Sequence, residues 1–285
     1  MSSQAETDVR PSPIAGTWYP DDPTILARTI DSLLAAATNP PLPGTVVGVI
    51  APHAGHRYSG AVAAHAFRCL EAERPEVVAV VSPLHTPHPA RLLTTTHQSF
   101  WTPLGTIPVA QDLLGRLAEL LLADSAIRLE TVAHDSEHSL EIELPFLQRA
   151  LRQPFRLLPL MVREQSPRVA EAVGRALATV LSGTPAVLVG STDLSHFFPA
   201  DVARRLDAEM LTRIAAFDPV AVMAAEDEGV GFACGRASAA AVLWAARQMG
   251  ADCARILRYG TSGDVTRDQS SVVGYAAAAI YRSTG

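Results

Sequence analysis

The chain has 285 residues, of which 48% are hydrophobic and 18% charged, with a formal net charge of −6. This composition excludes a disordered chain, and the uncharged apolar stretches reach only about half the length of a membrane-spanning helix. The negative charge argues against nucleic acid as a partner, because proteins that bind it present a basic face.

The predicted elements alternate between helices and buried strands. Residues 1–12 are polar and predict an N-terminal tail. Apolar spacing then predicts, in chain order, helix 25–34, strand 46–50, helix 60–72, strand 77–81, helices 111–122 and 141–151, strand 157–162, helix 169–181, strand 186–190, helices 203–217 and 237–249, and strands 254–259 and 272–281. This alternation predicts an α/β layered sheet, and we expect residues 1–285 to form a single domain.

Three of the predicted strands lead into a histidine. The first, second and fourth strands are followed within six residues by His53, His85 and His196. A single histidine at such a place is commonly a capping or packing residue. Ligands of open parallel sheets bind beyond the carboxyl ends of the strands, so three imidazoles at this edge indicate a functional site. His56 and His88 lie nearby in sequence and are interpreted as supporting or surface groups.

The cysteines add a further candidate. The chain has three of them, without a CxxC pair, which argues against a disulfide framework and a four-cysteine zinc site. The N-terminal residues lack the pattern of a signal peptide, so we expect a cytoplasmic protein with reduced thiols.

Cys234 lies between small residues directly before a predicted helix. It can be a buried core residue, or a thiolate favoured by the helix dipole and a metal. Two imidazoles and one thiolate would make a three-ligand site for iron, copper or zinc, with open positions for a substrate or O₂. The spacing leaves the choice of metal open.

The segment 134–146 carries another polar pattern. His138 and Glu141 are three residues apart and share one face of a predicted helix. This pair can bind a metal or transfer a proton, although a salt bridge at the helix end is the more common use of the spacing. The chain contains no HExxH, GxSxG, Walker or GxGxxG motif.

Motifs spread along nearly the whole chain occur in a specific order. They are RPSPIAGTWYP at 10–20, PHAGHRYSG at 52–60, SPLH at 82–85, EHSLEIELPF at 137–146, STDLSH at 191–196, ACGR at 233–236, and SGDVT with SVVGY at 262–275. Together they resemble the Memo-like family, whose bacterial and archaeal members are called AmmeMemoRadiSam system protein B.

The resemblance implies a three-layer αβα fold with a central mixed, mostly parallel sheet, similar to class III extradiol dioxygenases of the LigB type. It also implies a site at the sheet edge where His53, His85 and Cys234 hold iron or copper. The dioxygenases use two histidines and a carboxylate, which suits Fe(II) and O₂. A thiolate in place of the carboxylate makes the site softer and copper more competitive, so dioxygenase activity does not follow from the fold.

The resemblance implies roles for three further residues. His196 would line the pocket as an acid/base group. Asp193, in the same loop, would orient His196 or hydrogen-bond to it. His138 would complete the polar wall of the pocket.

Three functions stay open at this point. The first is an iron- or copper-dependent redox enzyme, dioxygenase-like or oxidase-type, in which His196 moves protons. The second is a non-catalytic protein that binds a peptide or anionic ligand, with Trp18 and Arg57 near the pocket, and acts with radical SAM and AMMECR1-like partners. The third is a hydrolase with Cys234 as nucleophile and His196 as base. The sequence does not identify the substrate, the native metal or the oligomeric state.

Overall fold

The centre of the fold is a parallel sheet built from runs of Val, Ile, Leu and Ala. The computed structural model describes residues 8–284 and shows four of these runs side by side. In spatial order they are β2 (Gly44–Ala51), β9 (Ala186–Ser191), β3 (Val77–Pro83) and β8 (Arg156–Val162), and each neighbouring pair is parallel. Almost all of their side chains are buried, because helices cover both faces of the sheet.

Further strands extend the sheet on both sides. Next to β2 lies β12 (Val272–Ser283), which is antiparallel to it. The other side of β12 pairs with β11 (Cys253–Thr261), and its first residues pair with β10 (His196–Phe198). Both of these pairings are also antiparallel. Beyond β8 lie β4 (Leu92–Thr95), antiparallel to β8, and β7 (Leu129–Val132), parallel to β4. Within the described residues the sheet therefore has nine strands and is mixed.

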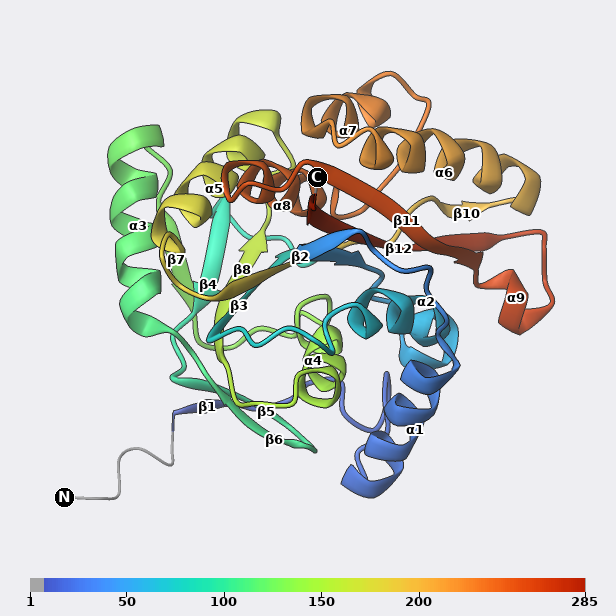
Figure 1. Cartoon of the computed structure of the whole chain (residues 1–285), viewed down its shortest axis with the longest axis horizontal. Helices are drawn as coiled ribbons and strands as arrows, with labels where there is room; N and C mark the ends of the chain where they lie inside the picture. The colour runs from blue at the N-terminus through green and yellow to red at the C-terminus, as the bar shows by residue number, and fades with distance from the viewer. Residues whose placement is uncertain (1–7, 285) are drawn as a thin grey trace.

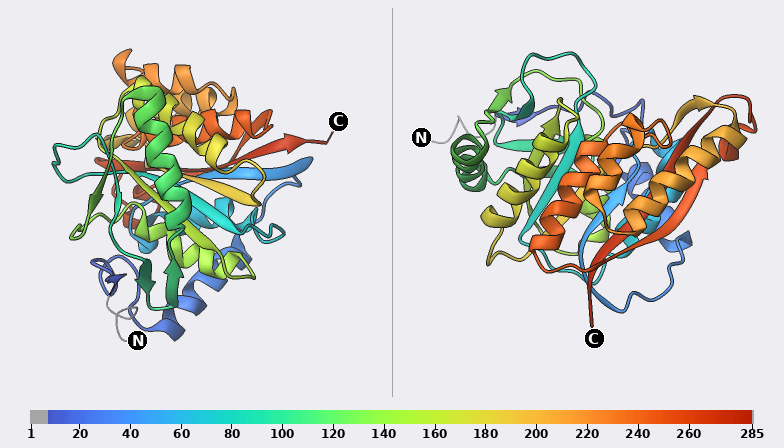
Figure 2. Two further views of the ribbon diagram at one scale, coloured as in Figure 1. Left: turned by 90° about the vertical axis from the view of Figure 1, so that its left-hand side faces the viewer. Right: turned by 90° about the horizontal axis from the view of Figure 1, so that it is seen from above.

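Two layers of helices enclose this sheet (Figure 1). Below it in that view lie α1 (Pro23–Ala36), α2 (His56–Arg68) and α4 (Leu144–Ala150). Above it lie α5 (Pro167–Val180), α6 (Ala200–Ala215), α7 (Pro219–Asp227) and α8 (Arg236–Gln248), and α3 (Gln111–Ser125) packs beside α5 (Figure 2). The predicted three-layer αβα fold is thereby confirmed. None of the helices among residues 8–284 combines the length and apolarity that a membrane span requires.

Three of the helices begin with the same type of N-cap. The side chains of Asp22, Ser166 and Asp218 accept hydrogen bonds from backbone N–H groups in the first turns of α1, α5 and α7. A proline follows each of these residues directly, at a position where the missing N–H costs nothing. These starts are therefore fixed by the local sequence.

A second, three-stranded sheet corrects the predicted tail over residues 1–12. It consists of β1 (Val9–Arg10), β5 (Ser99–Thr102) and β6 (Gly105–Pro108). The tail prediction is wrong from Val9 onward, because the buried Arg10 side chain has carboxylate partners inside the domain. The part of that prediction on residues 1–7 lies outside the described residues.

Other differences from the sequence prediction also have local causes. α2 begins four residues earlier than expected, at His56, whose N–H donates to the carbonyl oxygen of Trp18. The helix expected over 141–151 is divided into a short 3₁₀ helix, η1 (Glu141–Glu143), and α4, because Pro145 has no N–H to continue the helical hydrogen bonds. The four-residue strands β4 to β7 and the one-turn helix α9 (Gly263–Thr266) were too short to be predicted.

His56 is buried in the core, whereas His88 is exposed. The sequence interpretation as supporting or surface groups therefore fits His88 as a surface group. The His56 ring packs against the rings of Tyr19 and Phe146, and its Nε2 lies 3.0 Å from the carbonyl oxygen of Ile142. Burial lowers the pKa of His56 to about 4, so the folded protein keeps this ring neutral at neutral pH.

This burial predicts a loss of stability in mild acid. In the unfolded chain His56 binds a proton with a pKa near 6.5, but in the folded protein it does so only near 4, so the unfolding free energy falls as the pH falls through this range. Between about pH 6.5 and about pH 5, His56 should account for roughly 1–2 kcal/mol of that fall. Urea denaturation of the wild type and His56→Phe at both pH values measures this difference. A His88→Gln control should keep the wild-type dependence, and equal dependence in His56→Phe would contradict the assignment.

Candidate metal centre

The candidate centre lies at the carboxyl ends of three adjacent parallel strands. β2 ends at Ala51, β3 ends at Pro83, and β9, which ends at Ser191, lies between them. His53 and His85 each follow their strand by two residues. The prediction that the loops after these strands meet at one edge is confirmed by the pairing of the strands.

Cys234 reaches the same edge from the helical layer, directly before α8. Its backbone N–H donates to the carbonyl oxygen of Asp193 at 3.2 Å. Gly235 permits this approach, because a Cβ at that position would lie 2.3 Å from the carbonyl oxygen of Ser191. As a result, the Cys234 sulfur lies 3.1 Å from Nε2 of His53.

The structure brings the three predicted metal ligands together. One ligand atom from each of His53, His85 and Cys234 lies within 4.8 Å of the other two. Bonds from zinc to nitrogen and sulfur are about 2.0–2.3 Å long, so atoms at these separations can share one ion of that size. The His53 side chain is buried, whereas the His85 side chain is 38% exposed, so the cluster is open to solvent on the His85 side.

Ser191 determines the orientation of the His53 ring. Its Oγ lies 2.9 Å from Nδ1 of His53, which leaves Nε2 facing the sulfur of Cys234. Burial, together with the nearby His85, lowers the pKa of His53 well below its ordinary value. The ring is therefore neutral, which is the form of histidine that binds metals.

Glu137 determines the orientation of His85. One carboxylate oxygen lies 2.9 Å from Nδ1 of His85, and the other accepts the backbone N–H of His85 at 2.6 Å. Burial alone would raise the pKa of Glu137, but these hydrogen bonds lower it well below its usual range, so the group is ionised. A carboxylate behind a histidine is a common arrangement at metal sites, because it fixes the ring and makes its other nitrogen more basic.

The thiol of Cys234 is protonated in the absence of a metal. Burial and then the neighbouring Asp193 carboxyl raise the pKa of Cys234 well above its usual value. Asp193 itself accepts the backbone N–H of His53 at 2.8 Å, and burial raises its pKa to about 7. A metal ion that binds the sulfur must therefore release the thiol proton.

His196 lies at the start of β10 and has one free ring nitrogen. Its Nδ1–H donates to the carbonyl oxygen of Leu194 at 2.8 Å, which leaves Nε2 able to accept a proton. Burial lowers the pKa of His196, and the nearby His85 acts in the same direction. Among the described residues we find no hydrogen bond between Asp193 and His196, because the Asp193 carboxyl accepts the backbone N–H of His53 instead.

Phe197, directly after His196, has an unusual conformation. Its φ is +63°, a region that bulky residues rarely adopt, and the residue is 75% exposed. The ring centroid lies 5.6 Å from that of His196. Strain of this kind is concentrated at functional sites, and here it holds an apolar ring beside the candidate proton-transfer group.

His138 stacks between two rings at the cluster. Its ring centroid is 4.7 Å from that of His85, with an interplanar angle of 18°, and 4.1 Å from a ring of Trp18. Burial lowers the pKa of His138 to about 4. His138 therefore stands in the wall of the site, and it forms a second possible metal-binding group with His85 and Glu137.

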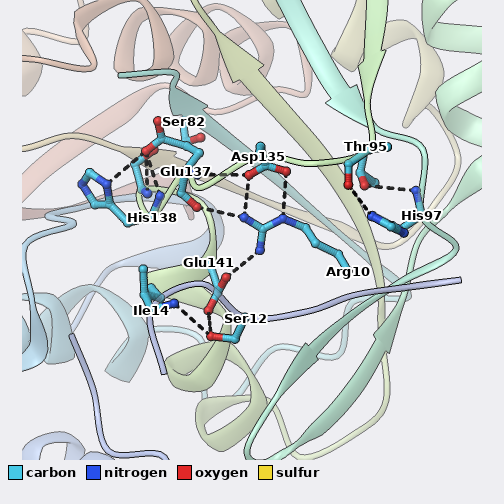
Figure 3. A network of polar contacts seen from close by, with 12 residues as sticks. Arg10, Ser12, Ile14, Ser82, Thr95, His97, Asp135, Glu137, His138 and Glu141 are labelled. Carbon is cyan, nitrogen blue, oxygen red and sulfur yellow. Dashed lines mark hydrogen bonds and ion pairs between the residues drawn. The ribbon is translucent and has the colours of Figure 1, made fainter. Parts of the chain in front are cut away.

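Glu141, the predicted partner of His138, has a different partner. It pairs with Arg10, whose guanidinium also makes two hydrogen bonds with Asp135, at 2.6 and 3.0 Å (Figure 3). The same guanidinium donates to the carbonyl oxygen of Glu137 at 3.0 Å. Because Glu137 holds His85, Arg10 connects the N-terminal strand to the loop that supports the cluster.

Sequence reasoning assigned no role to Glu137, Ser191, Glu143 or Arg10. The first three lie within conspicuous motifs, and a polar residue that ends a buried strand, as Ser191 does, is a usable signal. The contact between Arg10 and Glu141, which are more than one hundred residues apart, has no signal in the sequence. Arg57, expected near the pocket, is exposed, and its guanidinium lies over the ring of Tyr58.

Comparison with known proteins agrees with this arrangement. Residues 10–279 match the family described as Memo-like protein. The chain belongs to the Memo-like family. A MEMO1 family protein of Methanothermobacter thermautotrophicus is 37% identical over 278 residues, which cover 94% of this chain and 99% of that protein. A MEMO1 family protein of Methanopyrus kandleri is 34% identical over 279 residues, covering 94% of this chain and 98% of its own.

A solved structure shares the fold of this Memo-like protein. It is that of an uncharacterized protein from Escherichia coli K12, with a TM-score of 0.50 and 16% sequence identity, covering 80% of this chain and 98% of that one. At this identity the likeness concerns the fold alone, and it is consistent with a three-layer αβα arrangement.

The donor set of this Memo-like protein fits a transition-metal ion. Ser191 and Glu137 each engage Nδ1 of one imidazole, so the remaining nitrogens of His53 and His85 are free to bind a metal. The sulfur of Cys234 is the third donor. Imidazole and thiolate ligands suit iron, copper and zinc, whereas magnesium and calcium prefer oxygen ligands.

The buried Arg10 network predicts a large effect of substitution. Arg10→Met removes the only cation that we find paired with Asp135 and Glu141 in the described part of the chain. Two buried carboxylates then lose their partner, which should lower the unfolding free energy by about 3–5 kcal/mol, as measured by urea denaturation. Arg128→Met is a suitable control, since Arg128 is 72% exposed, and its effect should stay within about 0.5 kcal/mol. Equal stability of Arg10→Met and the control would contradict this account.

Proposed function

We propose that this Memo-like protein is an iron- or copper-dependent redox enzyme that acts on a small-molecule substrate at the His53, His85 and Cys234 cluster. The strongest support is the convergence of two nitrogens and one sulfur within 4.8 Å, with both rings oriented by hydrogen bonds from behind. Three protein ligands leave coordination positions open for a substrate or O₂.

Each residue of the cluster has a defined task in this proposal. His53, His85 and Cys234 would hold the ion, and Ser191 and Glu137 keep the two rings in place. A bound iron or copper ion would supply the electron transfer. His196 would accept or donate a proton at its free Nε2, since its other nitrogen is committed to the carbonyl oxygen of Leu194.

The thiolate would determine the relative affinity of the site for different metals. Sulfur is a softer ligand than the carboxylate of the iron-dependent dioxygenases, so copper competes better here than in a site of two histidines and a carboxylate. The neutral thiol must also lose its proton on binding, so the affinity for metal should increase with pH. Both iron and copper are therefore loaded in the experiments below.

The alternative function is a non-catalytic protein that binds a peptide or anionic ligand and acts with radical SAM and AMMECR1-like partners. The ionised carboxylate of Glu137, which lies 2.9 Å from Nδ1 of His85, makes the cluster less attractive to an anionic ligand. Substitution of Cys234 separates the two functions. Ligand binding should survive Cys234→Ala if the site only binds, whereas redox activity should be lost.

The geometry also favours a metal ligand over a nucleophile for Cys234. The imidazole that hydrogen-bonds to its sulfur is that of His53, and not that of the proposed base His196. A nucleophilic cysteine needs a lowered pKa, whereas burial raises the pKa of this thiol. We therefore prefer metal-dependent chemistry to hydrolysis.

The first prediction of the proposal concerns metal content. Protein purified without oxygen and reconstituted with Fe(II) or copper should retain one ion per chain, as measured by elemental analysis after gel filtration. Cys234→Ala should weaken binding by more than about 100-fold, since loss of a ligand costs more than loss of its supporting hydrogen bonds. Cys69→Ala is the matched control, because Cys69 lies at the far end of α2, where its sulfur accepts a hydrogen bond from the Asn39 amide. A wild-type protein that stays metal-free with both ions would overturn the proposal.

The second prediction separates proton transfer from metal binding. His196→Gln should slow O₂ consumption or substrate oxidation by about 100-fold or more, because general acid–base catalysis typically contributes that much. Its metal affinity should remain at the wild-type level, since its ring is not one of the three ligands. His88→Gln, at an exposed position, should leave both quantities unchanged. An unchanged rate in metal-loaded His196→Gln would remove His196 from the mechanism.

A further inference from the structure

A buried chain of hydrogen bonds runs from the cluster into the core. Nδ1 of His53 lies 2.9 Å from Oγ of Ser191, and that oxygen lies 2.7 Å from Oε1 of Glu143 and 2.7 Å from the carbonyl oxygen of Ser139. The side chains of His53, Ser191 and Glu143 are all buried. The three short contacts at one hydroxyl oxygen restrict where the hydrogen atoms can be.

Counting hydrogens at Ser191 assigns the protons. The carbonyl oxygen of Ser139 has no hydrogen to donate, so the single hydroxyl hydrogen of Ser191 must go to it. Glu143 can then approach Ser191 at 2.7 Å only if the carboxyl group carries a proton. By the same argument His53 must donate from Nδ1. The Ser191 hydroxyl thus donates once and accepts twice, which uses its full capacity.

We propose that Glu143 is a neutral carboxylic acid whose donated hydrogen bond fixes Ser191 and thereby holds His53 as the Nδ1–H tautomer, with the free Nε2 directed at Cys234. Glu143 is therefore a positioning residue, which acts on the cluster through Ser191. The assignment follows from the hydrogen-bond geometry around Ser191. It rests on the proposed function only in the experiment that measures metal affinity.

The surroundings of Glu143 differ from those of its neighbours in sequence. Glu137 is paired with His85, and Glu141 is paired with Arg10. Among residues 8–284 we find no ion-pair partner for Glu143. Burial raises the pKa of Glu143 well above its ordinary value, and the nearby Asp193 adds to this effect.

A neutral Glu143 has a chemical consequence for the cluster. An ionised carboxylate at this place would take the Ser191 hydroxyl hydrogen away from the carbonyl oxygen of Ser139. A neutral acid instead donates to Ser191 and leaves that hydrogen bond in place, so Ser191 keeps a lone pair for Nδ1–H of His53. The other ring nitrogen, Nε2, then faces the sulfur of Cys234.

Two measurements on metal-free protein test the protonation directly. The infrared difference spectrum between wild type and Glu143→Gln should contain the C=O stretch of an unionised carboxylic acid, lost in the variant. A lost carboxylate band in its place would overturn the inference. Nitrogen-15 NMR of the wild type should show His53 protonated at Nδ1, and protonation at Nε2 would overturn it equally. The NMR measurement needs no variant, so it stands even if Glu143→Gln folds poorly.

Metal titration tests the positioning role. Glu143→Gln keeps a donor for Ser191 and should bind iron or copper within about threefold of the wild type, whereas Glu143→Leu and Ser191→Ala should bind about 10- to 100-fold more weakly. Glu130→Gln, at an exposed position of β7, is the control and should bind as the wild type does. Equal affinity of Glu143→Leu and Glu143→Gln would overturn the positioning role. Absence of binding in the wild type would instead refute the proposed function, while the infrared and NMR results would still decide the protonation of Glu143.

Discussion

Parallel pairing of β9 with both β2 and β3 is the constraint on which the candidate centre depends. The three strands run in the same direction, so the loops that follow them all begin at one edge of the sheet. His53 and His85 then need only two residues beyond their strands to face each other. Ser191 ends the strand between them and is therefore placed to hold one of the rings. The helical layer has to contribute only Cys234.

Three glutamates in one short segment show how strongly the environment determines the behaviour of a side chain. Glu137, Glu141 and Glu143 are all buried. Glu137 is ionised and lies beside the His85 imidazole. Glu141 pairs with the Arg10 guanidinium and accepts hydrogen bonds from the hydroxyl groups of Ser12 and Tyr19. For Glu143 the described residues provide one hydrogen-bond partner, the Ser191 hydroxyl. Each glutamate has a different partner because Glu137 lies in the loop before η1, whereas Glu141 and Glu143 lie at its two ends. This segment therefore connects the N-terminal strand β1, the wall of the site and the candidate ligand His53.

Much of the fold, and the position of His53 and His85 at the sheet edge, could be predicted from short-range patterns in the sequence. The choice of His53, His85 and Cys234 as the candidate ligands came from the resemblance to the Memo-like family. Apolar runs identify buried strands, and a histidine just beyond such a run has to lie at the sheet edge. The hydrogen-bond partners could not be predicted in this way. Arg10 and Glu141 are separated by 131 residues, and His53 and Ser191 by 138, so their contact depends on how distant elements pack. Asp193 illustrates the same limit, since its carboxyl group accepts the N–H of His53, a residue 140 positions away in the chain.

The position of β12 has a consequence for how the protein reaches its native state. This strand, formed by residues 272–283, lies between β2 and β11, although β2 is synthesised more than two hundred residues earlier. During translation one edge of β2 therefore exposes unpaired N–H and C=O groups until β12 has left the ribosome. The loop after β2, which carries His53, stays attached to an incomplete sheet for the same period. Nascent chains should thus depend on chaperones that shield this open edge, and stop codons before residue 272 should yield aggregating products.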